Sequence, residues 1–270
     1  EDMTSDVTPE DLNNVENLHV QVASSSTTLS LASAGDDVES VVVDANSMSI
    51  TITDVDTVDT VAVSDAGTAM VTIEDVNSGN TVALTGSDNA KITGGSTLTL
   101  NVSDVNAEVE IATTTTNTLT IDVADSTDNA FDLVATAMTV LTVTGGGALT
   151  ISNEFGDTEL ADVTQIDGSS ATGAINVTVD GTTLTDVDTG SAGDMLHIKD
   201  SAAAATFSTN SGNDTVEIDA FGTTATLDTG SGGDKIELDT VIASGATIDG
   251  GEGSDTLEAS KNITTGSYDN

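Results

Sequence analysis

The chain has almost no basic side chains. Its 270 residues include 46 acidic side chains and only four basic ones, all lysines (Lys91, Lys199, Lys235 and Lys261), and the formal net charge is -42. A nucleic-acid backbone would be repelled by such a surface, so nucleic acid is excluded as a partner. Cysteine is also absent, so no disulfide framework supports the fold.

Large aromatic side chains are scarce as well. There is no tryptophan, one tyrosine and four phenylalanines. A thick core between two sheets would be hard to fill with so few rings, whereas a narrow solenoid needs only a stack of aliphatic side chains from successive turns.

Two further absences limit the possible functions. No run of about 18 apolar residues occurs, so we expect a chain that does not span a membrane. The only histidines are His19 and His197, and a serine nucleophile would have no convincing base, so we expect a protein that is not an enzyme. We find no leader before Glu1 and no export signal at the end, and we expect a processed or excised piece.

What the sequence does contain is alternation. Segments such as "SITITDVDTV" (49–58), "STLTLNVSDV" (96–105) and "TLTIDVADS" (118–126) contain runs in which Val, Ile or Leu occupies alternate positions, and they are bounded by Asp, Asn, Gly or Ser. They recur about every 20 residues, which is a repeat signal. The sequence therefore predicts an all-β protein, a right-handed parallel β-solenoid with about 20 residues per turn.

Composition divides this solenoid into four parts. We expect a linker or capping segment over 1–17, a Thr/Val-rich solenoid or repeat β domain over 18–163, a glycine- and aspartate-rich roll over 164–262, and a tail over 263–270.

The roll contains four loops that align residue by residue. They are "DTGSAGDMLHI" from Asp188, "STNSGNDTVEI" from Ser208, "DTGSGGDKIEL" from Asp228 and "DGGEGSDTLEA" from Asp249. Their closing aspartates are separated by 20, 20 and 21 residues: Asp194, Asp214, Asp234 and Asp255. The period predicts that these aspartates stack along one edge.

Stacked loops of this composition indicate a calcium site. Glycines allow positive φ and bring carbonyl oxygens together, and Ca²⁺ needs 6–8 oxygens, more than one loop supplies. We expect up to three sites, between Asp194 and Asp214, Asp214 and Asp234, and Asp234 and Asp255. The predicted ligand loops also contain Gly190, Gly212, Gly230, Gly232, Gly251, Gly253, Asp228 and Asp249.

Two alternatives stay open at this stage. Glycine and aspartate are common in tight turns, so the loops alone do not require a metal. The aspartates before the loops (Asp188, Asp228 and Asp249) either complete calcium shells or face water.

The last loop carries a family resemblance. Gly250, Gly251, Gly253, Asp255 and Leu257 match the pattern G-G-x-G-x-D-x-U-x, so the chain resembles RTX calcium-binding proteins. The other loops depart from it. Threonine replaces the first glycine in the loops from Asp188 and Asp228, and Thr209 and Asn210 replace both opening glycines in the loop from Ser208. Ala192 also replaces the inner glycine in the loop from Asp188. These departures predict that the site nearest Asp194 is the weakest.

A wider resemblance covers most of the chain. "VENLHV" (15–20) and "TQIDGSSATGAINVTVDG" (164–181) are similar to segments of large RTX-type bacterial surface-layer proteins. This implies type I secretion, a location outside the bacterial cell at its surface, calcium-dependent folding and self-assembly into a lattice or filament, with cell-surface polysaccharide as a further partner. The alternative is a repeat module of a secreted RTX adhesin or exoprotein.

Calcium would also control folding. We expect residues 165–262 to be disordered without calcium and folded with it, because repulsion between carboxylates opposes the roll when the ion is absent. Three ions would leave a net charge of -36, so calcium binding does not account for the whole acidity.

Overall fold

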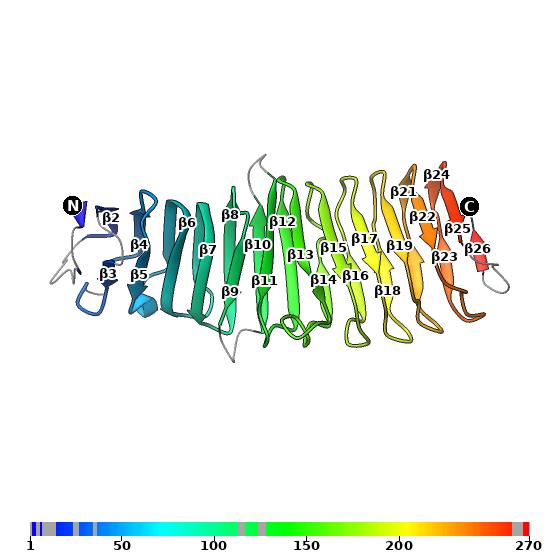
Figure 1. Cartoon of the computed structure of the whole chain (residues 1–270), viewed down its shortest axis with the longest axis horizontal. Helices are drawn as coiled ribbons and strands as arrows, with labels where there is room; N and C mark the ends of the chain where they lie inside the picture. Colours follow the sequence, from blue (N-terminus) through cyan, green and yellow to red (C-terminus); the bar gives the residue numbers. More distant parts are fainter. Residues whose placement is uncertain are drawn as a thin grey trace. The chain divides into compact units, whose positions relative to one another are not determined.

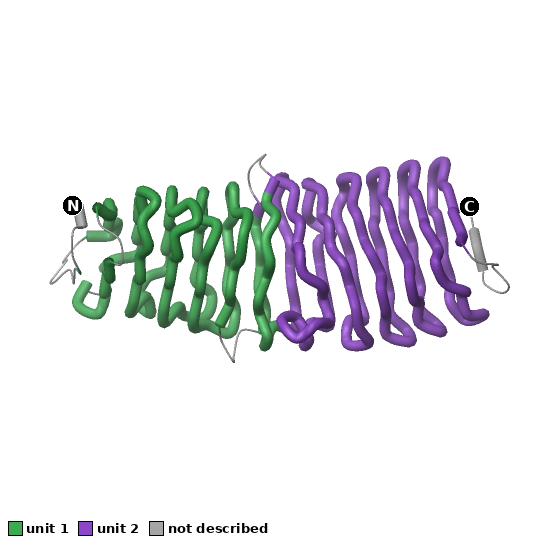
Figure 2. Tube along the Cα trace, viewed as in Figure 1, with its two compact units in different colours: residues 1–122, 129–138 green, residues 123–128, 139–270 purple. Residues whose placement is uncertain are grey.

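The computed structural model describes residues 2–3, 6, 15–23, 27–34, 37–112, 117–123, 128–260 and 267–269. They form two compact units, one of residues 1–122 and 129–138 and the other of residues 123–128 and 139–270 (Figure 2). Regular structure in these ranges is β-strand, apart from the 3-10 turn η1 (Val55–Thr57). No helix in the described ranges is long and apolar enough to cross a membrane.

The first unit is a stack of parallel strands joined by short corners (Figure 1). Its strands are β1 (Asp2–Met3), β2 (Asn17–Val22), β3 (Thr27–Ser30), β4 (Ser40–Asp44), β5 (Ile50–Thr53), β6 (Thr60–Val76), β7 (Thr81–Gly94), β8 (Thr97–Ser103), β9 (Glu108–Ile111), β11 (Asn129–Val134) and, except for its last residue, β10 (Thr118–Val123).

These strands form two parallel ladders. One runs β1, β2, β4, β6, β7, β8, β10, and the other runs β3, β5, β6, β7, β9, β11. β6 and β7 belong to both ladders because each continues around a corner, where Asp65, Gly67 and Gly86 adopt positive φ. Aligned residues such as Val41, Val61 and Val82 lie 20 and 21 positions apart.

The second unit repeats this arrangement with shorter strands. One ladder runs β12 (Val140–Gly145), β14 (Gln165–Asp167), β16 (Asp186–Asp188), β18 (Thr206–Ser208), β20 (Thr226–Asp228), β23 (Thr247–Asp249) and β26 (Ser267–Asp269). The other runs β13 (Leu149–Phe155), β15 (Ile175–Val179), β17 (Met195–Ile198), β19 (Thr215–Ile218), β22 (Lys235–Leu238) and β25 (Thr256–Ala259). A third, short ladder pairs β21 (Ser231–Gly232) with β24 (Glu252–Gly253).

The core of each unit consists of the alternate residues of each strand whose side chains point inward. In β5 and β10, for example, Ile and Leu are buried and the alternating threonines are partly exposed. Three of the four phenylalanines, Phe131, Phe155 and Phe207, are fully buried among Val, Ile and Leu. Small aliphatic side chains therefore fill a narrow interior, as the scarcity of aromatic residues predicts.

The predicted fold class is confirmed in each unit: all-β, parallel, with about 20 residues per turn. The units follow the packing of the chain, whereas the expected boundary at residue 164 follows composition and falls inside the second unit, so that division stays a prediction. Much of the predicted linker (1–17) and tail (263–270) lies outside the described residues, although β26, within that tail, pairs in parallel with β23.

Candidate calcium-binding loops

The four glycine–aspartate loops lie in register between the two ladders of the second unit. Before the loops, Asp188, Ser208, Asp228 and Asp249 occupy one aligned position. After the loops, Met195, Thr215, Lys235 and Thr256 occupy another. The residues just before these four are Asp194, Asp214, Asp234 and Asp255, called the aspartate column below. The structure brings together the four closing aspartates that the spacing predicts.

The loop glycines are required by the close approach of neighbouring turns. A Cβ added to Gly212, Gly232 or Gly253 would collide with a backbone carbonyl of the preceding turn, and each has φ between 140° and 153°. A Cβ on Gly230 or Gly251 would likewise collide with the preceding loop, at φ of 82° and 72°. A Cβ on Gly190 would also collide with the carbonyl of Ala171. All six predicted glycines therefore lie where the backbones of neighbouring turns are too close for a side chain.

One oxygen of each column aspartate binds the backbone of the turn before it. The Oδ1 atoms of Asp214, Asp234 and Asp255 accept hydrogen bonds from the backbone N–H of Asp194, Asp214 and Asp234, at 2.8, 2.9 and 3.0 Å. Asp194 Oδ1 accepts from the N–H of Ile175 at 2.8 Å. The column is thus a hydrogen-bonded ladder that joins five successive turns.

The second oxygen distinguishes Asp194 from the other three aspartates. Asp194 Oδ2 accepts a hydrogen bond from the N–H of Gly190 at 3.0 Å. The Oδ2 atoms of Asp214, Asp234 and Asp255 are buried and have no hydrogen-bond partner within the described residues. A buried oxygen without a partner costs about 1–3 kcal/mol, more if it is charged, so these three atoms require an explanation.

The aspartates before the loops explain part of this difference. Asp228 Oδ1 accepts from the N–H of Gly230 at 2.9 Å, and Asp249 Oδ1 accepts from the N–H of Gly251 at 3.0 Å. In the first loop the equivalent N–H, that of Gly190, is donated to Asp194 instead. Asp228 and Asp249 therefore cap their own loops, and this leaves Asp234 and Asp255 with a free oxygen.

Burial also makes the column electrostatically costly. Asp194, Asp214 and Asp234 are only 3%, 1% and 1% exposed. Burial raises the pKa of Asp214 to about 6, the N–H of Asp194 and the nearby hydroxyl of Thr209 oppose this, and the charges of Asp194 and Asp234 add to the increase. Burial likewise raises the pKa of Asp194, against the hydrogen bonds that it accepts. A bound cation would remove this penalty by placing positive charge beside the carboxylates.

The loop carbonyl oxygens are already used between turns. Asn210 O accepts from the N–H of Ser231 at 2.9 Å, Ser231 O from Gly212 at 2.9 Å, and Gly230 O from Glu252 at 2.7 Å. A carbonyl oxygen has two lone pairs, so these atoms are able to share a cation with the carboxylates. The fit to calcium rests on three buried carboxylate oxygens that have no partner in the described residues, one for each expected site, in loops that also carry backbone carbonyl oxygens.

A column of threonines beside the aspartates is missed by sequence reasoning. Thr189, Thr209 and Thr229 are fully buried, and in the motif they look like substitutes for the first glycine. Thr209 Oγ1 donates to Thr229 O at 3.1 Å, and Thr229 Oγ1 donates to Gly250 O at 3.0 Å, while Thr189 Oγ1 has no partner in the described chain. The sequence signal that could have revealed this column is the recurrence of threonine at the same position of three loops.

Comparison with known proteins gives no match to this chain among protein-family models, curated proteins or solved structures.

Proposed function

We propose that the loops of residues 188–255 bind calcium and that the chain is a structural protein whose solenoid is stabilised by this ion. The observation that carries the proposal is the set of buried Oδ2 atoms of Asp214, Asp234 and Asp255, which have no partner in the described residues. Lys235, the lysine nearest to this edge in sequence, is paired with Glu237 and Glu258 instead.

Calcium fits these atoms better than a proton does. A proton on Asp214 would neutralise the charge but would leave a carboxylic O–H in need of an acceptor. A hard divalent cation neutralises two carboxylates at once and takes oxygen ligands, including backbone carbonyls. When bound, calcium supplies positive charge between successive turns, and Asp214, Asp234 and Asp255 hold it with the loop carbonyls.

The size of the effect matches a folding switch. With a Kd of about 10⁻⁴–10⁻³ M, typical of extracellular modules, about 10 mM calcium stabilises the folded state by roughly 1.4–2.7 kcal/mol per site. Three such sites contribute about 4–8 kcal/mol, comparable to the whole stability of a domain.

The proposal is tested by calcium titration of the purified chain. Isothermal titration calorimetry should give up to three calcium ions per chain, and the triple variant Asp214→Asn/Asp234→Asn/Asp255→Asn should bind none in the same range. The matched control is Asp65→Asn/Asp75→Asn/Asp104→Asn, three aspartates of the first unit with positive φ, two of them within the bent strand β6 and one just after β8. Equal calcium binding by the two triple variants would contradict the proposal.

The biological role that we propose follows from the RTX-like loops and the extreme acidity. The chain belongs outside a bacterial cell and assembles with copies of itself into a surface lattice or filament. Calcium abundance outside a cell favours folding there, and the remaining negative charge keeps the surface hydrated. The second candidate, a repeat module of a secreted RTX adhesin or exoprotein, is favoured by the same loops and does not require self-association.

Electron microscopy separates these two roles. Negative-stain images at about 10 mM calcium, chosen as about ten to a hundred times the expected Kd, are compared with chelated samples. Ordered sheets or filaments only with calcium would support the assembling protein. Separate particles under both conditions would overturn it in favour of the module.

A further inference from the structure

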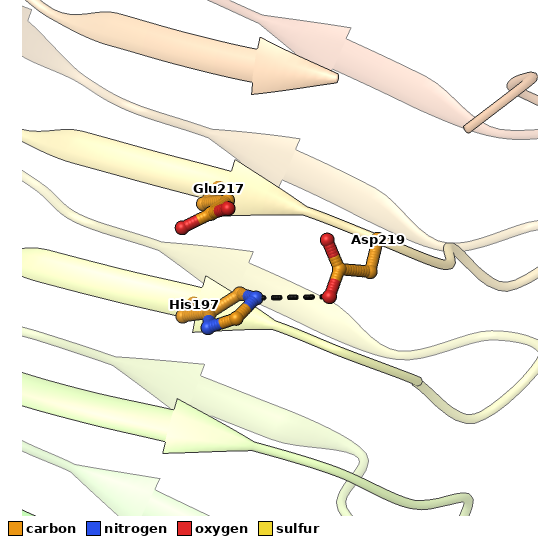
Figure 3. A group of neighbouring side chains, drawn as sticks. All are labelled: His197, Glu217 and Asp219. Atoms are coloured by element: carbon orange, nitrogen blue, oxygen red, sulfur yellow. Dashed lines mark hydrogen bonds and ion pairs between the residues drawn. The ribbon is translucent and has the colours of Figure 1, made fainter. Parts of the chain in front are cut away.

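A second cluster of potential metal ligands lies away from the loops, on the solvent side of β17 and β19. His197 in β17 is aligned with Glu217 in β19, and both alternate with buried aliphatic residues, so both side chains point away from the core. Asp219 follows Glu217 by two positions, and its side chain therefore leaves the chain on the same side. Figure 3 shows the imidazole and the two carboxylates gathered over these neighbouring turns.

The three side chains are close enough to share one ion. His197 Nε2 lies 3.1 Å from Asp219 Oδ2, and one ligand atom from each of the three residues lies within 4.8 Å of the other two. The side chain of His197 is 24% exposed and that of Asp219 40% exposed, so the group is accessible without being fully solvated. The backbone of Glu217 pairs in the ladder, but its carboxylate makes no hydrogen bond or ion pair with the described residues, which leaves it free to join them.

The nearby lysines are held by other carboxylates. Lys199, the residue that follows β17, forms an ion pair with Glu154 at 2.5 Å. Lys235 pairs with Glu237 at 2.5 Å and with Glu258 at 3.1 Å. Glu237 is aligned with Glu217 on the next turn and adds to the negative charge around the cluster. A cation placed between His197 and the two carboxylates would thus be attracted rather than repelled.

We propose that His197, Glu217 and Asp219 bind a divalent transition-metal ion of the zinc class. Zinc takes imidazole nitrogen at about 2.0–2.1 Å and carboxylate oxygen at about 2.0–2.2 Å, and tetrahedral geometry then separates neighbouring ligand atoms by about 3.3 Å. The observed 3.1 Å between His197 and Asp219 is close to this separation. A rotamer change of the free Glu217 completes three ligands, and water takes the fourth position.

This site differs chemically from the loops. Calcium prefers six to eight oxygens, whereas the cluster offers an imidazole nitrogen and few oxygens. The ligands come from two successive turns, since His197 is in β17 and the carboxylates are in and after β19. A bound ion would therefore crosslink two turns on the outer surface, separately from the aspartate column.

Zinc calorimetry tests the site directly. Zinc chloride is titrated into the full chain in excess calcium, so that calcium already occupies the loops and weak carboxylate sites. We expect one zinc ion per chain, with an affinity reduced at least about tenfold in His197→Ala and in Asp219→Asn. The matched control is His19→Ala, which removes the other histidine and should leave zinc binding unchanged. Unchanged zinc affinity in His197→Ala, or equal losses in both histidine variants, would overturn the proposal.

Imidazole resonances provide a readout that does not depend on substitution. The chain has two histidines, so nuclear magnetic resonance of the ring nitrogens distinguishes His197 from His19 once one variant has assigned them. One equivalent of zinc should shift the nitrogens of His197 and leave those of His19 in place. A shift of neither ring, or of both to the same extent, would contradict the site. Circular dichroism in calcium verifies that each variant is folded.

Discussion

The two compact units are built from the same kind of parallel turn but close their corners with different chemistry. Among the described residues of the first unit, the buried polar ones are neutral: Thr27, Ser87 and Asn129. Their groups find partners in the protein, as Ser87 does with Thr85 O at 3.2 Å and Asn129 with the N–H of Val105 at 3.1 Å. In the second unit the corner buries Asp194, Asp214 and Asp234.

The two units also differ in their buried side-chain oxygens that lack a hydrogen-bond partner. The four buried side-chain oxygens without a hydrogen bond in the described residues all belong to the second unit. A neutral amide or hydroxyl completes a corner by itself, whereas a carboxylate accepts hydrogen bonds and cannot donate one. A carboxylate corner is therefore complete where backbone N–H groups reach both oxygens, as at Asp194. Where one oxygen has no donor, as at Asp214, Asp234 and Asp255, the proposed calcium would supply the missing partner.

The largest expected effect is that of removing calcium. Chelation should reduce the stability of the second unit by about 4–8 kcal/mol and leave the first unit nearly unchanged, because the free carboxylates belong to residues 214–255. Hydrogen exchange measured peptide by peptide, with and without chelator, checks this. A similar loss of protection in residues 40–110 would break the comparison.

A smaller but substantial effect is expected from a methyl group in a loop. Gly232→Ala should destabilise the calcium-loaded protein by about 3 kcal/mol, since its Cβ would collide with the carbonyl of Gly212 at a φ of 153°. The control is Gly67→Ala in the first unit, which has φ of 56° and open space around the added atom, and should cost about 1 kcal/mol. Urea unfolding in calcium measures both, and equal costs would contradict the close stacking of the loops.

Within the aspartate column, two substitutions should differ in their dependence on calcium. Asp234→Asn should remove about 1.4–2.7 kcal/mol of calcium-dependent stability, since its Oδ2 is free. Asp194→Asn should lower stability with or without calcium, because its Oδ2 already accepts from Gly190 and an amide nitrogen there would face a donor. Unfolding of both variants at two calcium levels measures the coupling, and an equal loss of the calcium increment would refute the distinction.

The smallest expected effect is a dependence on pH in the presence of chelator. The folded-state pKa of Asp214 is raised to about 6, above the ordinary value of 3.8, so the ionised group destabilises the folded state above about pH 6. This penalty is removed as the pH falls from about 6 towards 3.8, and stability of the calcium-free roll should rise over that range. Asp214→Asn should flatten the profile. A calcium-free stability that falls steadily below pH 6 in the wild type, with the same slope in the variant, would contradict it.

Much of the fold follows from the sequence because the solenoid is repetitive. Period-two alternation fixes which side chains are buried, and a repeat of about 20 residues fixes which strands pair, so the alignment of Asp194, Asp214, Asp234 and Asp255 needs no long-range information. The long bent strands β6 and β7 were harder to predict, since their course depends on positive φ at Asp65 and Gly67 in β6 and at Gly86 in β7.

The hydrogen bonds within the loops were not predictable from spacing. Whether the N–H of Gly190 meets Asp188 or Asp194 depends on the local path of the loop, which composition does not encode. Thr189, Thr209 and Thr229 match the motif poorly, and only the structure shows that they are buried beside the column. His197 is isolated in sequence, and its approach to Asp219 arises from the register between two turns.

The hydrogen bond from the N–H of each turn to the column aspartate of the next turn affects how the number of repeats can change during evolution. Every turn presents the same amide to the next turn and receives the same carboxylate from it, so one turn is interchangeable with another. The spacing of 21 residues between Asp234 and Asp255 is tolerated because the extra residue lies in the opposite corner, over 239–246 rather than 219–225, and the register of both ladders is kept. Duplication or deletion of a whole repeat in a gene would therefore lengthen or shorten the protein without creating a new kind of junction.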